Sequence, residues 1–137
     1  MKGYNLIAIL SPDADRWLMC KRKKPPFEGL YNLVGGKIEA NETSRDAAYR
    51  ELFEETGIPS SDVSLTHLMD LTYHVCGFYI EVYVGRLSHA LPLTEEENAL
   101  SWMPLDLDYF DNTQFAGEGN LGHVLRHILL YKNTLFA

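Results

Sequence analysis

The chain has 137 residues, 46% of them apolar, which suits one folded domain over residues 1–137 with a single hydrophobic core. Its formal net charge is −7, and a nucleic-acid polymer is not the expected partner because the sequence lacks the basic stripe that such binding needs. No apolar run approaches the roughly 18 residues of a membrane span and no secretion signal opens the chain, so we expect a cytoplasmic protein without a membrane partner.

The N-terminal part is predicted to begin with two paired strands. Residues 4–10 form a short apolar run with β-branched side chains, and residues 16–22 alternate well enough to pair with them across a turn. A basic cluster overlaps the second strand and is either a solvated loop or a contact for substrate phosphates, with Arg22 and Lys24 the better candidates. The members of this cluster are Arg16, Lys21, Arg22, Lys23 and Lys24.

Residues 31–37, YNLVGGK, are predicted to be a loop that approaches a ligand. Gly35 and Gly36 allow close approach of the backbone, and Lys37 can neutralise a phosphate. A Gly-Gly pair alone is more often a simple turn, so the prediction of a ligand-binding loop depends on the segment that follows.

Residues 43–56 are predicted to be a helix because they contain no Pro or Gly and are rich in Ala, Arg, Leu and Glu. Asn41 or Thr43 can cap its start, and Gly57 supplies a left-handed stop. The face that can pack on a sheet holds Ala47, Ala48 and Leu52.

Three carboxylates share another face of this helix, because Glu51, Glu54 and Glu55 follow i,i+3 and i,i+4 spacing. A like-charged pair ~4 Å apart costs about 4 kcal/mol at an effective dielectric near 20, so the face requires a cation. All-oxygen ligands select a hard divalent ion, Mg²⁺ first and Mn²⁺ next. Arg50 lies four residues before Glu54 and eight after Glu42, where its guanidinium can hold a carboxylate ionised and correctly aimed. A solvated acidic helix face is the alternative, which the preceding Gly-Gly-Lys disfavours.

The second half of the chain supplies further strands and a closing helix. Residues 63–75 and 78–87 are predicted to form a hairpin, and residues 95–100 a short helical turn before a strand at 101–103. Residues 121–131 carry apolar side chains at helical spacing. This order of elements indicates an α/β protein in which a mixed β-sheet lies between helices, an α/β/α sandwich.

The most specific pattern runs from Gly36 to Ile58 and reads G-x5-E-x7-R-E-(apolar)-x-E-E-x-G-(apolar). It resembles the signature box of the Nudix hydrolases, the MutT-type pyrophosphohydrolases, and every fixed position of the box is met. The resemblance implies a Nudix fold and metal-assisted hydrolysis of a phosphoanhydride bond, with Glu42 and Arg50 among the catalytic residues. The metal ligands that it implies are Glu51, Glu54, Glu55 and a backbone carbonyl of Gly35 or Gly36, of which we favour Gly35.

The general base varies within this class of enzymes. It can be a helix glutamate such as Glu51 or an acidic residue from a distant loop, although any one such acid is more simply a surface charge. A base typically contributes about 10²–10⁴-fold, so substitution identifies it. The loop candidates are Glu95, Glu96, Glu97 and Glu118.

The pair Tyr31-Asn32 resembles the aromatic-Asn pair of family members that hydrolyse oxidised purine triphosphates. In those members the asparagine lies in the nucleobase pocket and a second Asn or Asp near the last helix reads the base edge. Asn120 is the candidate for that second role and Asn112 the fallback, although an Asn at a helix start is more often a cap. Some aromatic residues offer stacking surface if they are not part of the core: Phe27, Tyr73, Phe78 and Phe115.

Two functions from different classes stay open. The first is a Mg²⁺-dependent hydrolase that converts a nucleoside triphosphate, oxidised or not, to the monophosphate and pyrophosphate, with ADP-ribose or a nucleotide sugar as the alternative substrate. The second is a non-catalytic Nudix module that binds a nucleotide for regulation. Such a module would be expected to lose a box glutamate or Arg50, and this chain keeps them all.

The oligomeric state, monomer or homodimer, is left open by the sequence. His123, His127 and Tyr131 are spaced four residues apart on the last predicted helix and form either an interface stripe or a polar boundary face. Cys20 and Cys76 show no metal-ligand spacing, and we expect reduced, buried thiols.

Overall fold

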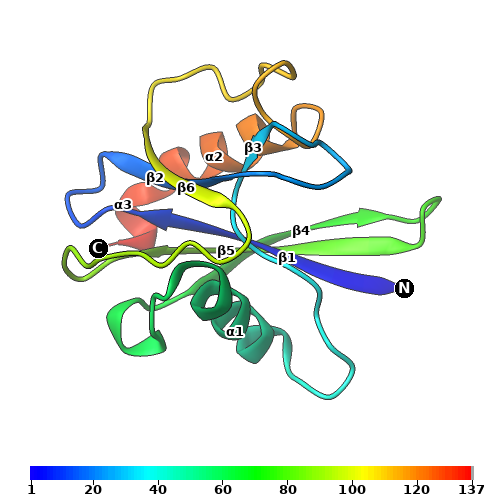
Figure 1. The fold of residues 1–137 in the computed structure, drawn as a ribbon, viewed down its shortest axis with the longest axis horizontal. Helices are drawn as coiled ribbons and strands as arrows, with labels where there is room; N and C mark the ends of the chain where they lie inside the picture. Colours follow the sequence, from blue (N-terminus) through cyan, green and yellow to red (C-terminus); the bar gives the residue numbers. More distant parts are fainter. Residues whose placement is uncertain (137) are drawn as a thin grey trace.

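A computed structural model describes residues 1–136 of the protein. Its sheet lies between helix α1 on one face and helix α2 on the other (Figure 1). The predicted α/β/α sandwich is therefore confirmed. The elements in chain order are β1 (Lys2–Leu10), β2 (Arg16–Lys21), β3 (Tyr31–Asn32), α1 (Ser44–Thr56), η1 (Ser60–Asp62), β4 (Thr66–Tyr73), β5 (Phe78–Arg86), β6 (Ala99–Pro104), α2 (Asn120–Leu130) and α3 (Lys132–Leu135).

The sheet is mixed and follows the order β3-β2-β1-β5-β4, with β6 added to β2. β1 and β5 are parallel along their whole length, whereas the other pairs are antiparallel. β4 and β5 form the predicted hairpin with its turn at residues 74–77. β1 is central and buried on both faces near its end, as expected for a strand covered by helices on two sides.

The sheet forks between β1 and β2, and this fork positions the glycine loop. β1 meets β2 only where Leu10 faces Trp17. Towards the start of β1, the segment that follows β3 takes the place of β2 beside it. Isolated bridges join Ile7 to Val34 and Tyr4 to Lys37. Residues 35 and 36 are thereby carried into the middle of the sheet.

Two apolar layers hold the helices on the sheet. On the α2 side, Leu121, Val124 and Ile128 are buried against residues of β1, β2 and β5. On the α1 side, Ala48 and Leu52 are buried against Ile7 and Ile9 of β1 and other strand residues. The apolar face predicted for the first helix is therefore confirmed, and α2 covers the opposite face of the same sheet. A single domain over residues 1–137 stays a prediction.

The predicted helical turn at residues 95–100 is wrong. Leu100 belongs to β6 and pairs with Cys20 of β2, and the segment before it is irregular. The Glu95 side chain takes a backbone group that a helical turn would use, because it accepts from the backbone N–H of Leu100 at 2.6 Å. Asn98 is held by a distant residue instead, its side chain accepting from the backbone N–H of Lys23 at 3.0 Å.

Other boundaries differ for local reasons. The predicted strand at 63–75 begins only at Thr66, because Leu65 donates its backbone N–H to the hydroxyl of Tyr49 at 2.9 Å. The short strand β3 and the short helix α3 were not predicted. Cys20 is buried as expected, but Cys76 is exposed in the hairpin turn, which corrects that expectation. Within residues 1–136, no helix is long and apolar enough to cross a membrane.

Candidate active site

Helix α1 presents its charged side chains because its apolar side is fixed on the sheet. Thr43 caps the helix, its hydroxyl accepting from the backbone N–H of Asp46 at 3.1 Å, so of the two predicted caps Thr43 is correct and Asn41 is not. Gly57 ends it at φ +77°, and its N–H donates to the carbonyl of Phe53 at 2.8 Å, as predicted for a left-handed stop. Both ends of the carboxylate helix are thus determined.

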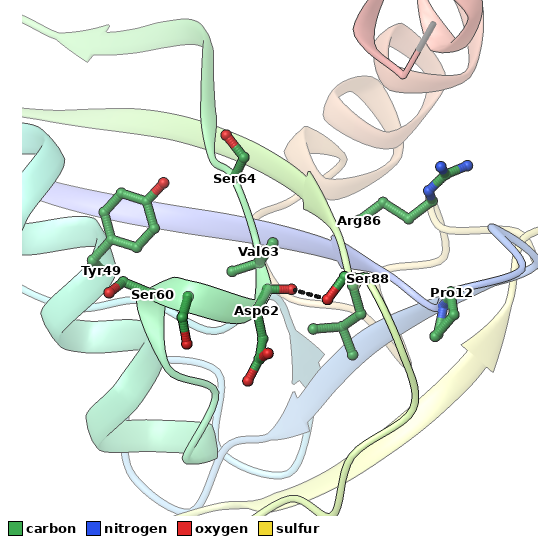
Figure 2. A pocket seen from close by; sticks show the side chains of 10 residues that line it. Pro12, Tyr49, Ser60, Asp62, Val63, Ser64, Arg86 and Ser88 are labelled. Atoms are coloured by element: carbon green, nitrogen blue, oxygen red, sulfur yellow. Dashed lines mark hydrogen bonds between the residues drawn. The ribbon is translucent and has the colours of Figure 1, made fainter.

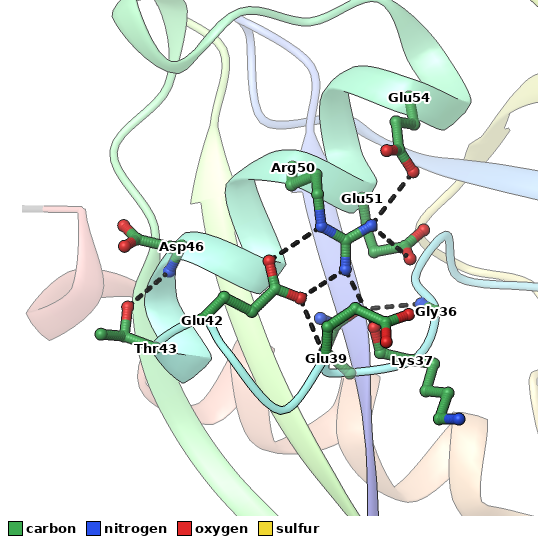
Figure 3. Close-up of polar contacts among 10 residues, drawn as sticks. Gly36, Lys37, Glu39, Glu42, Thr43, Asp46, Arg50, Glu51 and Glu54 are labelled. Carbon is green, nitrogen blue, oxygen red and sulfur yellow. Dashed lines mark hydrogen bonds and ion pairs between the residues drawn. The ribbon is translucent and has the colours of Figure 1, made fainter.

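Arg50 lies at the centre of an ion-pair network (Figure 3). Its Nε and Nη2 donate to the two carboxylate oxygens of Glu42 at 2.9 and 2.6 Å, a bidentate pair. Its Nη1 donates to Glu51 at 3.0 Å and to Glu54 at 3.1 Å, and Nη2 also donates to the carbonyl of Lys37 at 3.0 Å. One guanidinium therefore orients three carboxylates and holds the glycine loop on the helix.

The pKa values in this network follow from its contacts. The hydrogen bonds from Arg50 lower the pKa of Glu42 to about 2, so Glu42 is ionised at neutral pH. The same contacts, with Glu42 first, raise the pKa of Arg50. Burial raises the pKa of Glu51, opposed by Arg50, and raises that of Glu55 to about 7, opposed by the Gly35 N–H. Glu55 lies outside the ion pairs of Arg50, so its charge calls for another cation.

The glycine loop touches both the helix and β1. A Cβ on Gly36 would overlap the carboxylate of Glu51, and one on Gly35 would overlap the carbonyl of Asn5. The Gly35 N–H faces Glu55 at 3.4 Å. The Gly36 carbonyl accepts from the backbone N–H of Asn5 at 2.8 Å, which leaves the Gly35 carbonyl as the better ligand candidate.

Asn5 is a residue that the sequence reading missed. Its side chain is 2% exposed, and its Oδ1 accepts from the backbone N–H of Gly36 at 2.9 Å. Asn5 therefore holds Gly36 by two hydrogen bonds, one from its backbone and one to its side chain. The available signal was a single amide in an otherwise apolar strand run, but the partner lies 31 residues away.

A cavity of about 870 Å³ opens beside the carboxylates of α1. The loop before β6 forms its far wall and is tied to α1, because the backbone N–H of Thr94 donates to the carbonyl of Thr56 at 2.9 Å. Lys24 and Glu97, both in the cavity wall, form an ion pair at 3.0 Å. The lining residues are Lys24, Glu51, Phe53, Glu54, Glu55, Gly57, Thr94, Glu96 and Glu97.

The structure separates the four loop candidates for the general base. Glu96 and Glu97 line the cavity, and the Glu97 charge contributes to the raised pKa of Glu55. Glu95 instead accepts the backbone N–H of Leu100. Glu118 is exposed just before α2 and does not line this cavity. Geometry thus favours Glu96 and Glu97, and the identity of the base stays a prediction.

The predicted nucleobase residues lie at β3 and at the start of α2. Tyr31 and Asn32 form β3, and Oδ1 of Asn32 accepts the N–H of Leu33 at 2.8 Å. Asn120 donates to the hydroxyl of Tyr73 and makes no cap, since the N-cap of α2 is Gly119. These positions leave the nucleobase roles as predictions.

The remaining predicted contacts are spread over loops and core. Asn112 is exposed in the loop after residue 105, and Phe115 is buried in the core. Arg22 donates its Nε to the carbonyl of Pro26 at 2.7 Å, and the side chain of Lys37 is exposed. Of the three basic candidates for phosphate contact, Arg22, Lys24 and Lys37, only Lys24 lines the cavity.

A second cavity, of about 520 Å³, lies away from the box carboxylates (Figure 2). Tyr49, Ser60, Asp62 and Ser88 contribute to its wall, and Ser88 Oγ donates to the Asp62 carbonyl at 3.2 Å. No carboxylate of the α1 charged face lines it. The larger cavity is therefore the candidate active site.

The donors of the candidate active site fit a hard divalent cation. They are carboxylate oxygens of Glu51, Glu54 and Glu55, which line the cavity, an all-oxygen set of the kind that Mg²⁺ and Mn²⁺ bind. The backbone N–H of Gly35 lies 3.4 Å from Glu55, so the glycine loop passes beside this set. Glu55 gives a second reason: no basic side chain among residues 1–136 forms an ion pair with it, and burial raises its pKa, so its charge needs compensation.

Comparisons with known proteins identify the family. The profile described as NUDIX domain matches residues 1–117. A mouse protein, oxidized purine nucleoside triphosphate hydrolase, is 30% identical over 107 residues that cover 75% of this chain and 66% of that protein. The chain thus spans just under two thirds of this relative's length.

Two solved structures are similar in fold. One is an Ap4A hydrolase of C. elegans, with a TM-score of 0.78 and 17% identity over 98% of this chain and 99% of that one. The other is a MutT NUDIX hydrolase of Burkholderia pseudomallei, with a TM-score of 0.67 and 26% identity over 93% and 97% of the two chains. Given the family profile over residues 1–117 and a complete signature box, this chain belongs to the NUDIX domain family.

Proposed function

We propose that the protein is a Mg²⁺-dependent hydrolase of a phosphoanhydride bond in a nucleoside diphosphate-linked substrate. The observation that carries this proposal is the set of Glu51, Glu54 and Glu55 facing a cavity of about 870 Å³, with Arg50 orienting the first two. Mn²⁺ is a possible substitute, since the donors are all oxygen. A nucleotide-binding module without catalysis has no need to retain this complete set.

Each residue of the site has a proposed part in the reaction. When bound, the divalent ion would offset charge on the diphosphate and lower the pKa of an attacking water. Arg50 holds the carboxylates of Glu51 and Glu54 in fixed orientations, so these side chains need not reorganise during the reaction. Lys24 and Lys37 offer positive charge to phosphate oxygens. Glu97 or Glu96 takes a proton from the attacking water. The water oxygen then bonds to phosphorus while the phosphoanhydride P–O bond breaks.

The proposed substrate is a nucleoside triphosphate, oxidised or not, cleaved to the monophosphate and pyrophosphate. Support comes from the mouse relative, whose name gives oxidised purine nucleoside triphosphates as its substrate class. Tyr31 and Asn32 on β3 and Asn120 on α2 are the proposed nucleobase contacts. ADP-ribose or a nucleotide sugar stays the alternative substrate.

The deciding experiment measures phosphate or pyrophosphate release from a substrate panel, with Mg²⁺ and with chelator. The panel holds the (d)NTPs, 8-oxo-dGTP, ADP-ribose, nucleotide sugars and dinucleoside polyphosphates. We expect chelator-sensitive turnover of a triphosphate, lowered about 10²–10³-fold or more by Glu55→Gln, which removes a metal ligand. Asp46→Asn, on the same helix but outside the cavity, is the matched control and should keep full activity.

Two outcomes would overturn the proposal. Full activity of Glu55→Gln would contradict the metal assignment. Nucleotide binding by calorimetry without turnover of any substrate would identify a binding module instead.

A further inference from the structure

Three potential metal ligands meet on the β4–β5 hairpin, outside the candidate active site. One ligand atom each of His67, Asp70 and Glu81 lies within 4.8 Å of the other two. Nε2 of His67 is 2.6 Å from Oδ1 of Asp70. None of the three lines the cavity beside the box carboxylates.

A β-bulge brings these side chains onto one face of the sheet. Residues three apart in a regular strand point to opposite faces, so His67 and Asp70 would be separated. The register of β4 shifts between His67 and Met69, which places His67 opposite Tyr83 and Asp70 opposite Glu81. Because positions 81 and 83 share a face, His67 and Asp70 share it as well.

The imidazole is held in place by stacking. The rings of His67 and Tyr83 are 4.8 Å apart between centroids, with an angle of 20° between their planes. The stack restricts the ring of His67, so its Nε2 stays directed at Asp70. A fixed ring loses less conformational freedom when it binds an ion.

The charges of this cluster are not balanced within it. Asp70 and Glu81 are directly opposite on neighbouring strands, where like charges destabilise a sheet. Oε2 of Glu81 is buried and has no hydrogen-bond partner among residues 1–136. Asn5 is the neighbour of Glu81 on β1, and its Nδ2 also has no hydrogen-bond partner among residues 1–136. The amide of Asn5 and the carboxylate of Glu81 therefore do not bond to each other. A buried carboxylate oxygen without a donor calls for a cation.

We propose that His67, Asp70 and Glu81 form a second metal site, selective for a transition ion of the Zn²⁺ type. One imidazole and two carboxylates are ligands that Zn²⁺ accepts, and three protein ligands leave a fourth tetrahedral position for water. The imidazole distinguishes this site from the all-oxygen donors of α1, which suit Mg²⁺. The proposal is independent of the hydrolase activity.

The test is calorimetric titration of Zn²⁺ into the chelator-stripped full chain in excess Mg²⁺. His123 and His127 lie one turn apart on α2, with ring centroids 4.3 Å apart, and can bind Zn²⁺ themselves. The reference protein is therefore His123→Ala, and we expect it to bind one Zn²⁺. Adding His67→Ala should weaken this binding at least about tenfold, since even outer-shell partners of a metal contribute 10–100-fold. Adding His74→Ala, in the turn of the same hairpin, should change nothing.

Equal Zn²⁺ affinity of the His123→Ala protein with and without His67→Ala would overturn the proposal. Only weak, multiple binding in the reference protein would do the same and identify adventitious ions. Co²⁺ gives an independent readout, because a tetrahedral site produces intense visible absorption that His67→Ala should abolish. His67 is partly exposed, so its substitution tests the site even where Glu81→Gln fails to fold.

Discussion

At the scale of single residues, Arg50 organises the candidate active site more than any other side chain does. It contacts Glu42, Glu51 and Glu54 by their carboxylates and Lys37 by its carbonyl. A planar fork of donors can serve these acceptors at once, whereas an ammonium group cannot.

Arg50→Lys should therefore lower kcat/KM by about 10–100-fold while the chain stays folded. The charge is kept, but the bidentate pair with Glu42 is lost and the glutamates of the helix are no longer aimed. Steady-state kinetics with circular dichroism measure this. Arg45→Lys is the matched control, since Arg45 lies on the same helix and donates to the Leu65 carbonyl at 2.7 Å. Equal losses in both variants would contradict the role given to Arg50.

Asn5 is the second residue with a specific expectation. Asn5→Ala removes the acceptor of the Gly36 N–H, so the glycine loop should loosen and Mn²⁺ affinity should fall about tenfold. Mn²⁺ binding followed by electron paramagnetic resonance measures the affinity, and urea unfolding measures the stability. Ser11→Ala is the control, because Ser11 holds backbone N–H groups of a turn at the far end of β1. A loss of stability with unchanged Mn²⁺ affinity would make Asn5 a purely structural residue.

At the scale of elements, local patterns predicted what local contacts determine. Helix α1 follows from its composition, its Thr43 cap and its Gly57 stop, all of which act within a few residues. Residues 95–100 were predicted wrongly because a distant partner, β2, and side-chain bonds to the backbone decide their conformation. Asn5 was missed for the same reason. The carboxylate cluster could be predicted because one helix carries all three glutamates. The fork of the sheet, which brings the glycine loop to them, could not, because it depends on long-range strand pairing.

The end of α1 offers a test of how this element is coupled to the cavity wall. A Cβ at Gly57 would meet Oγ1 of Thr94 at 3.0 Å, and φ is +77°. Gly57→Ala should therefore lower the free energy of unfolding by about 1–2 kcal/mol, from backbone strain and from this contact. Gly77→Ala is a matched control with φ +74° and open space around the added Cβ. Urea unfolding of both separates strain from contact, and equal losses would show that the Thr94 contact costs nothing.

At the scale of the whole molecule, the fold concentrates negative charge on the face of α1 that lines the candidate active site. The chain has a net charge of −7, and the half-buried Glu51 and Glu55 add a local cost in the absence of a cation. The fold thereby couples its own stability to pH and to metal.

The direction of this coupling follows from the pKa of Glu55, which burial raises from 4.5 to about 7. The folded protein holds this proton more tightly than the unfolded chain, so the resulting stability is complete below about pH 4.5 and is lost as the pH rises through about 7. Glu51 acts in the same direction. Glu42 acts in the opposite direction, because Arg50 lowers its pKa from 4.5 to about 2. Its stabilisation is complete above about pH 4.5 and is lost as the pH falls from there through about 2.

With chelator present, the free energy of unfolding from urea titrations should therefore fall between pH 5 and pH 8, and Glu55→Gln should reduce this fall. Mg²⁺ should stabilise the wild type most above pH 7, where its ligands are ionised, by an amount that grows with its concentration. Asp46→Asn should behave as the wild type. The contradicting result would be that the wild type and Glu55→Gln show the same stability and the same Mg²⁺ response from pH 5 to pH 8. In that case Glu55 would neither carry the buried charge nor bind the metal.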